Sequence, residues 1–218
     1  MDAQSILSGL NSDQRAAVLH DHEAHAQLLI LAGAGSGKTS VLTKRIQYRI
    51  LCGVQPEKIL ALTFTAKAAA EMRERVQKLF PNAGVRLCTF HSLALYMLKQ
   101  EVPSSTGVNV PAYKLLGFEK MPVPTESADR EFLQKLSRLK LKTGTLNLIY
   151  LAIRLLETDE IACDFFRQQW TEILVDEYQD INPTQYRMVK NLLGSRKSLF
   201  VVGDDDQAIY GFRGADIG

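Results

Sequence analysis

Short, almost continuously apolar runs alternate with segments of helical periodicity along most of this 218-residue chain. Runs of this kind are typical of strands buried in a parallel sheet, and their alternation with helices predicts an α/β fold. The expected strands are 28–31, 59–64, 85–90, 172–175 and 199–202. Parallel strands end at the same edge of a sheet, so the residues that follow each run are candidates for a shared site.

The helix expected after the fourth strand has the clearest boundaries. Asn182 is a suitable N-cap, and Pro183 suits the first helical position. Tyr186, Val189 and Leu193 recur on one side of this helix, and we expect that side to be buried.

One region interrupts the alternation. Residues 103–111 and 121–127 are rich in turn-forming residues and are expected to be loops, whereas 128–168 shows helical periodicity only. We therefore expect a helical insertion over 103–170 that divides one α/β domain into parts 1–102 and 171–218. The insertion includes a basic helix near 132–140, which suits either contact with a nucleic-acid backbone or a solvated charged face.

Composition and charge add little beyond a globular class. Apolar residues make up 46% of the chain and charged residues 23%, and a net charge of +2 does not by itself indicate a nucleic-acid partner. The three cysteines are scattered, which suits thiols in a reducing compartment. The chain shows neither a signal peptide nor an apolar run long enough to span a membrane, so we expect a cytoplasmic protein without membrane association.

The strongest chemical signal follows the first strand, where residues 32–39 read Ala-Gly-Ala-Gly-Ser-Gly-Lys-Thr. A glycine-rich loop between a strand and a helix can point its N–H groups at a phosphate, although a flexible glycine loop is the alternative. In a phosphate-binding loop, Lys38 would reach the β- and γ-phosphates and Thr39 would ligate Mg²⁺. The residues expected to bind nucleotide here are Ala32, Gly33, Ala34, Gly35, Ser36, Gly37, Lys38, Thr39 and Ser40.

Two later strands also end in polar groups. The fourth strand is followed by Asp176, which would complete the Mg²⁺ site, and Glu177, which would polarise the attacking water. The fifth leads through the aspartates 204–206 to Gln207, whose amide can donate and accept and therefore suits a γ-phosphate sensor. For the aspartates, a solvated loop or a helix-start cap is the alternative to a role in the site, and Asp205 and Asp206 suit either interpretation.

These blocks together resemble the UvrD/Rep-type superfamily 1 DNA helicases. The matching blocks are 10–14 (the Q motif), 32–39 (the P-loop, in which the family normally has Ala first), 62–72 (motif Ia), 89–92 (the next DNA-facing block), 176–180 (motif II) and 202–215 (motif III). The resemblance implies a RecA-like P-loop NTPase sheet flanked by helices, with 103–170 as a shortened 1B subdomain. It also implies ATP and Mg²⁺ as cofactors, with Gln14 contacting the adenine base.

The resemblance further implies ATP-driven 3′ to 5′ movement on single-stranded DNA, with duplex junctions as substrates and repair or recombination proteins as possible partners. Four side chains that follow strand ends are candidates to contact DNA: Phe64, His91, Tyr210 and Phe212. Aromatic rings there could stack on unpaired bases without reading sequence, although core positions would also explain some of them.

Three departures from the family pattern bear on function. Ser40 stands where many relatives carry arginine, Phe212 stands where tryptophan is frequent, and the sequence stops at Gly218, just after motif III. We therefore expect the ATP-binding N-terminal lobe of an ATP-dependent single-stranded-DNA translocase or helicase, weakly active or inactive without its C-terminal RecA-like domain. The alternatives are a non-catalytic ATP- or DNA-binding regulatory module and, with less support from Gln14 and motif II, a P-loop kinase or transporter ATPase.

Overall fold

The structure is a computed structural model that describes residues 3–20, 27–117, 148–194 and 198–204. The chain forms two compact units. The first comprises the residues up to Thr89, Gln169–Pro183 and the residues from Leu193 onward, and the second comprises Phe90–Gln168 and Thr184–Leu192. The predicted boundaries 1–102, 103–170 and 171–218 stay a prediction, and the predicted basic helix near 132–140 lies outside the described residues.

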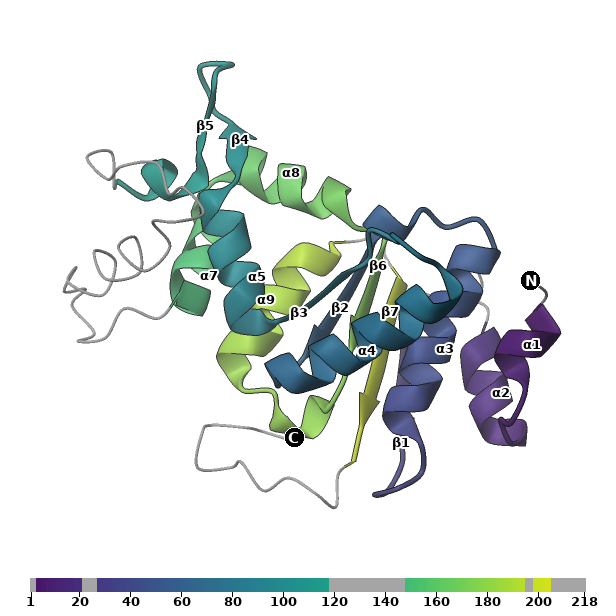
Figure 1. Cartoon of the computed structure of the whole chain (residues 1–218). Coiled ribbons are helices and arrows are strands. Elements are labelled where there is room, and N and C mark those ends of the chain that lie inside the picture. Colours follow the sequence, from purple (N-terminus) through teal and green to yellow (C-terminus); the bar gives the residue numbers. More distant parts are fainter. Residues whose placement is uncertain (1–2, 21–26, 118–147, 195–197, 205–218) are drawn as a thin grey trace. The chain divides into compact units, whose positions relative to one another are not determined.

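A parallel sheet forms the centre of the first unit. Its strands, in spatial order, are β1 (Gln27–Leu31), β7 (Ser198–Gly203), β6 (Glu172–Val175), β2 (Ile59–Thr63) and β3 (Arg86–Thr89) (Figure 1). Every neighbouring pair is parallel. The five predicted strands and the α/β class are therefore confirmed, and the first three strands found along the chain are separated by helices α3 (Lys38–Leu51) and α4 (Ala66–Leu79).

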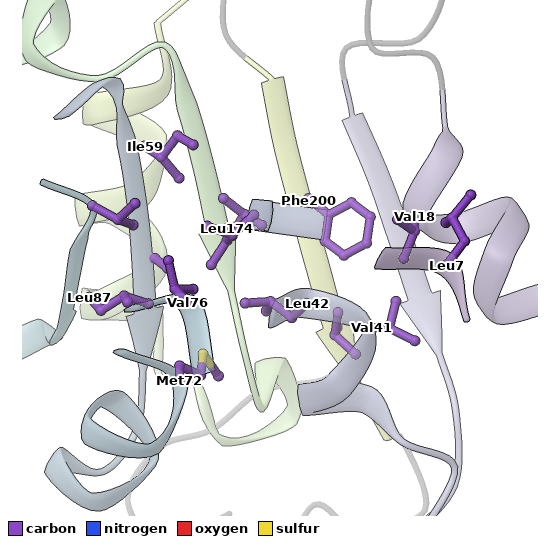
Figure 2. Packing of buried hydrophobic residues seen from close by; sticks show 14 residues of the cluster. Leu7, Val18, Val41, Leu42, Ile59, Met72, Val76, Leu87, Leu174 and Phe200 are labelled. Carbon is purple, nitrogen blue, oxygen red and sulfur yellow. The ribbon is translucent and has the colours of Figure 1, made fainter. Parts of the chain in front are cut away.

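Helices α3 and α4 lie on one face of this sheet (Figure 1). Their apolar stripes supply Leu42 and Ile46 from α3 and Met72 and Val76 from α4 to a continuous core. Figure 2 shows these helices' side chains packed against strand residues such as Phe200. Each large aliphatic side chain contributes about 1.5–3 kcal/mol when it is fully buried. The packing of α3 and α4 against the sheet therefore stabilises the position of the strand ends.

The short N-terminal helices α1 (Ala3–Leu7) and α2 (Ser12–Leu19) pack on α3 in the same unit. Two cationic side chains of α3 donate hydrogen bonds to carbonyl oxygens at the C-terminal ends of these helices. Lys44 donates to the carbonyl oxygens of Ile6 and Ser8. Arg45, which is fully buried, donates to the carbonyl oxygens of Val18 and His20, each at 2.7 Å. Positive charge at a helix C-terminus is favourable, so α2 is fixed to the helix that follows the glycine loop.

We expect Arg45→Met to lower the free energy of unfolding by about 2–3 kcal/mol, because a buried and a partly buried carbonyl oxygen lose their charged donor. The guanidinium also lies 5.4 Å from the Phe200 ring centroid, so packing is lost as well. Urea unfolding of the chain would measure the loss. Lys67→Met on the exposed face of α4 is the matched control and should change stability by less than about 0.5 kcal/mol.

The second unit is mainly helical. It contains α5 (Phe90–Lys99), the 3₁₀ turn η2 (Ala112–Leu116), α7 (Leu148–Thr158), α8 (Glu160–Gln169) and most of α9 (Pro183–Leu193). Helices α5 and α7 pack together, and Arg187 of α9 makes a bidentate ion pair with Glu157 of α7. Within the described parts of the chain, no helix combines the length and apolar character that a membrane span requires.

Two local predictions are wrong. Residues 103–111, which we expected to be a loop, include a short antiparallel hairpin of β4 (Glu101–Pro103) and β5 (Asn109–Pro111). Tyr186 is 48% exposed, whereas Met188 and Leu192 supply buried side chains of α9. Val189 and Leu193 are buried as predicted, so only Tyr186 departs from the expected stripe, and the helix starts at Pro183 as predicted.

Candidate active site

The glycine loop joins the end of β1 to the start of α3. Gly35 and Gly37 have φ angles of 73° and 85°, in the left-handed region that side chains disfavour. Gly37 is the N-cap of α3, so Lys38 begins the helix. The loop is tied to the neighbouring strand because the N–H of Ala32 donates to the carbonyl oxygen of Gly203 at 3.0 Å. Its free N–H groups and the helix start together form a suitable site for an anion.

The Lys38 ammonium is folded back inside this loop. It donates to the carbonyl oxygens of Ala32 at 2.7 Å and Gly33 at 3.1 Å, and it forms an ion pair with Asp204 at 3.1 Å. Both charged side chains are buried, with Lys38 9% exposed. A buried ammonium needs polar partners, and these oxygens fill that need here. Phosphate oxygens could replace them as acceptors from Lys38.

Thr39 and Asp176 meet although they are 137 residues apart: the Thr39 hydroxyl donates to an Asp176 carboxylate oxygen at 3.3 Å. Asp176 directly follows β6, and its N–H donates to the carbonyl oxygen of Leu62 in β2. Mg²⁺ in nucleotide sites typically takes one or two protein oxygens, with phosphate and water completing the octahedron. This hydroxyl and carboxylate fit that role. The described residues hold no cluster of three or more His, Cys, Asp or Glu side chains suited to a metal.

The Asp176 carboxyl is poorly solvated. Burial, and then the charge of Glu177, raise the pKa of Asp176 from 3.8 to about 6. Hydrogen bonds from the Glu177 N–H and the Thr39 hydroxyl, and the charge of Lys38, oppose this rise. The local charge balance therefore favours a bound cation, since a cation would stabilise the ionised carboxylate.

Glu177 has an unusual backbone conformation. Its φ and ψ are both 52°, which is uncommon for a residue with a side chain. It precedes the single 3₁₀ turn η4 (Tyr178–Asp180), and its carboxylate accepts a 2.6 Å hydrogen bond from the Gln179 amide. Strain of this kind is found most often at functional sites.

Two contacts of this site involve residues whose roles the sequence did not reveal. Asp204, for which the sequence left a solvated loop, a helix cap or a role in the site open, pairs with Lys38 through its carboxylate. Its backbone N–H donates to the Gln179 side-chain oxygen at 2.9 Å. Gln179 lies two positions after Glu177, and Asp204 lies two positions after the end of the predicted strand 199–202. This closeness in sequence is the signal that could have identified both residues.

Gln14 lies next to the glycine loop. Its amide N–H donates to the carbonyl oxygen of Ser36 at 2.7 Å, and its oxygen accepts from the N–H of Asn11 at 3.0 Å in a capping box. A hollow of about 220 Å³ opens beside it. The residues that line the hollow are Asn11, Asp13, Gln14, Ala17, Ile30, Leu31, Ala32, Ser36, Lys38, Val41 and Val202. Leu31 is 56% exposed and forms part of an apolar wall of this hollow, whereas Asn11, Asp13, Gln14 and Ser36 give it polar groups.

The structure describes two of the four side chains predicted to contact DNA. Phe64 is half-buried just past the end of β2, and His91 is exposed in the first turn of α5. They belong to different compact units. Tyr210, Phe212 and the predicted γ-phosphate sensor Gln207 lie outside the described residues.

The sheet and the glycine loop define a RecA-like α/β domain of the P-loop class. A family model described as the UvrD/REP helicase N-terminal domain matches residues 10–119 and 114–218. The chain therefore belongs to this helicase family, and the resemblance inferred from the sequence motifs is confirmed.

The similar proteins are longer than this chain. DNA helicase II of Rickettsia typhi is 33% identical over 268 aligned positions, which cover 100% of the chain and 40% of that protein. ATP-dependent DNA helicase PcrA of Staphylococcus aureus is 35% identical over 262 positions, which cover 98% of the chain and 35% of that protein. The chain thus spans less than half the length of these relatives. The alignment with the first relative is also longer than the 218-residue chain, so that relative has additional residues within this region.

Proposed function

We propose that this chain is the ATP-binding N-terminal lobe of an ATP-dependent translocase on single-stranded DNA, or DNA helicase. The observation that carries the proposal is the convergence of Lys38, Thr39 and Asp176 at the carboxyl ends of β1 and β6, where α/β sheets bind their ligands. The names of the similar proteins, DNA helicase II and ATP-dependent DNA helicase PcrA, support this class of activity.

The contacts suggest a division of roles. The loop N–H groups and Lys38 hold the phosphates, with Lys38 exchanging its bonds to the loop carbonyls and Asp204 for phosphate oxygens. Thr39 and Asp176 would hold Mg²⁺, which neutralises phosphate charge when it is bound. Glu177 orients and polarises the attacking water. Gln207 contacts the γ-phosphate, a role that follows from its place in motif III.

The hollow beside Gln14 suits the base and ribose of the nucleotide. Its apolar wall, which includes Ile30 and Leu31, offers a surface for a purine ring, and the Gln14 amide offers one donor and one acceptor to the base edge. The hollow is continuous with the glycine loop because Ala32, Ser36 and Lys38 also line it. A nucleoside triphosphate could therefore lie with its phosphates in the loop and its base against α2.

Hydrolysis and movement require more than this lobe. We propose that a C-terminal RecA-like domain supplies arginines to the γ-phosphate, a contribution worth about 10³- to 10⁵-fold in rate. Single-stranded DNA and duplex junctions would be the substrates, with Phe64, His91, Tyr210 and Phe212 as DNA contacts. Repair or recombination proteins are the expected partners, and the compartment is the cytoplasm.

The second candidate function is a non-catalytic regulatory module. It is favoured only by Ser40, because the rest of the glycine loop is intact.

The test is ATP hydrolysis by the full-length protein with and without single-stranded DNA. The wild type should show DNA-stimulated turnover, and Lys38→Ala should weaken nucleotide binding and lower turnover on the order of 10²-fold, because a preorganised cation is lost from the phosphates. Equilibrium binding of a fluorescent ATP analogue measures the first effect. A wild-type protein that binds ATP yet never hydrolyses it on DNA would favour the regulatory module instead.

A further inference from the structure

The side-chain amide of Gln179 connects two parts of the candidate active site. Its nitrogen donates to the Glu177 carboxylate at 2.6 Å, and its oxygen accepts from the backbone N–H of Asp204, 25 residues further along the chain, at 2.9 Å. Gln179 is 6% exposed, and both ends of its amide are satisfied. The residue therefore spans from the water-polarising carboxylate to the end of β7.

The orientation of this amide is fixed by its partners. A backbone N–H can only donate, so the oxygen of Gln179 must face Asp204. The NH₂ group must then face Glu177, whose ionised carboxylate can only accept. A donor bonded to a carboxylate makes a stronger hydrogen bond than one between neutral groups, so this contact restricts the carboxylate effectively.

Local structure alone would leave the Glu177 carboxylate weakly restrained. The residue precedes a single 3₁₀ turn, has left-handed backbone angles, and is only partly buried. The Gln179 amide supplies the missing restraint, because its other end is held by the N–H of Asp204, directly after β7, the strand that lies between β1 and β6 in the sheet.

The closeness of Gln179 to β7 also explains why position 203, the last of β7, is occupied by glycine. A Cβ atom at Gly203 would lie 3.2 Å from the Gln179 side-chain oxygen and 3.1 Å from the Cβ of Tyr178. Both distances are tighter than ordinary contacts, so a side chain at position 203 would require the Gln179 oxygen or Tyr178 to shift by a few tenths of an ångström.

We propose that Gln179 is a positioning residue for ATP hydrolysis: its amide holds the Glu177 carboxylate in the orientation that polarises the attacking water, using the end of β7 as its support. This inference rests on the proposed function, in which Glu177 acts on that water. In this role Gln179 acts through Glu177 rather than on the nucleotide or the water itself. Residues that orient an active-site carboxylate in this way typically contribute about 10- to 100-fold to activity.

The test uses the full-length protein in a DNA-stimulated ATP hydrolysis assay. Gln179→Met keeps the length of the side chain and removes both hydrogen bonds, so kcat should fall about 10- to 100-fold while KM for ATP stays near the wild-type value. Gln47→Met is the matched control, because Gln47 is also buried and its amide donates to a carbonyl oxygen, that of Arg75, at 2.8 Å. This control should keep the wild-type kcat even if its melting temperature falls.

Two further variants separate positioning from a purely structural role. Gln179→Glu keeps an oxygen for the Asp204 N–H and loses the donor to Glu177, so it should be as impaired as Gln179→Met. Recovery of kcat in Gln179→Glu would mean that only the bond to β7 matters and would overturn the proposal. In a Glu177→Gln background, Gln179→Met should cause no further loss of turnover, whereas a second, equal loss would show independent roles and also overturn it.

The outcomes distinguish this inference from the proposed function. If the wild type does not hydrolyse ATP on DNA, or if Glu177→Gln keeps full turnover, both the proposed function and the role of Gln179 are contradicted. If those two proteins behave as expected and Gln179→Met keeps the wild-type kcat, only the positioning role of Gln179 is lost.

Discussion

The full-length protein carrying Glu177→Gln is expected to bind Mg²⁺ and ATP as the wild type does and to lose DNA-stimulated turnover by about 10²- to 10⁴-fold. The substitution keeps the size of the side chain and removes its ability to polarise or accept a proton from water. Asp176, Thr39 and Lys38 should keep their own contacts, because the hydrogen bonds described above for these residues do not involve the Glu177 carboxylate. The loss should therefore appear in kcat and leave nucleotide affinity largely intact.

Single-turnover hydrolysis and fluorescent-nucleotide binding would measure the two effects separately. Glu74→Gln is a suitable control, because Glu74 is an exposed residue of α4 that pairs only with Lys78 at 3.0 Å among the described ion pairs. It should match the wild type in both assays. Undiminished DNA-stimulated turnover in Glu177→Gln would remove Glu177 from the catalytic role and leave the water without its assigned base.

Much of the first unit could be predicted from the sequence, because its strands are buried in a parallel sheet and therefore appear as continuous apolar runs. The predicted strand 172–175 agrees with β6 residue for residue, and the glycine loop lies between β1 and α3 as expected. The meeting of Thr39 with Asp176 also follows from the rule that the carboxyl ends of parallel strands share an edge.

Predictions were less accurate where long-range packing decides the outcome. Of the stripe predicted for α9, Val189 and Leu193 are buried, but Tyr186 is exposed, and Met188, which was not predicted, is buried. The hairpin of β4 and β5 was missed because its strands are only three residues long and each ends in proline, which breaks the usual strand signal. The Gln179 bridge depends on a contact with Asp204 from a distant strand, which no local pattern encodes.

The second large effect concerns Asp176, whose buried carboxylate lies beside Glu177. The pKa of Asp176 rises from 3.8 to about 6 in the folded chain, a change worth roughly 3 kcal/mol. Because the folded chain binds this proton more tightly than the unfolded chain, the contribution to stability is fully present below about pH 4 and is lost as the pH rises through about 6. In the absence of metal, the ionised carboxylate therefore destabilises the fold at neutral pH.

Asp176→Asn should remove this penalty together with the candidate Mg²⁺ ligand. With EDTA present, the variant and the wild type should be similar in stability near pH 4, and the variant should be more stable by roughly 3 kcal/mol near pH 7. Denaturant unfolding followed by the fluorescence of Trp170, the chain's single tryptophan and a buried one, measures the difference.

Mg²⁺ and ATP should reverse that order, because the cation stabilises the wild-type carboxylate and finds no charged ligand at position 176 in the variant. The same substitution should abolish hydrolysis by the full-length protein, so the variant would trade activity for stability, as is typical of strained catalytic groups. A variant that is no more stable than the wild type near pH 7 in EDTA would show that the Asp176 carboxylate is already compensated without a metal ion. That result would remove the electrostatic reason for placing Mg²⁺ at this end of β6.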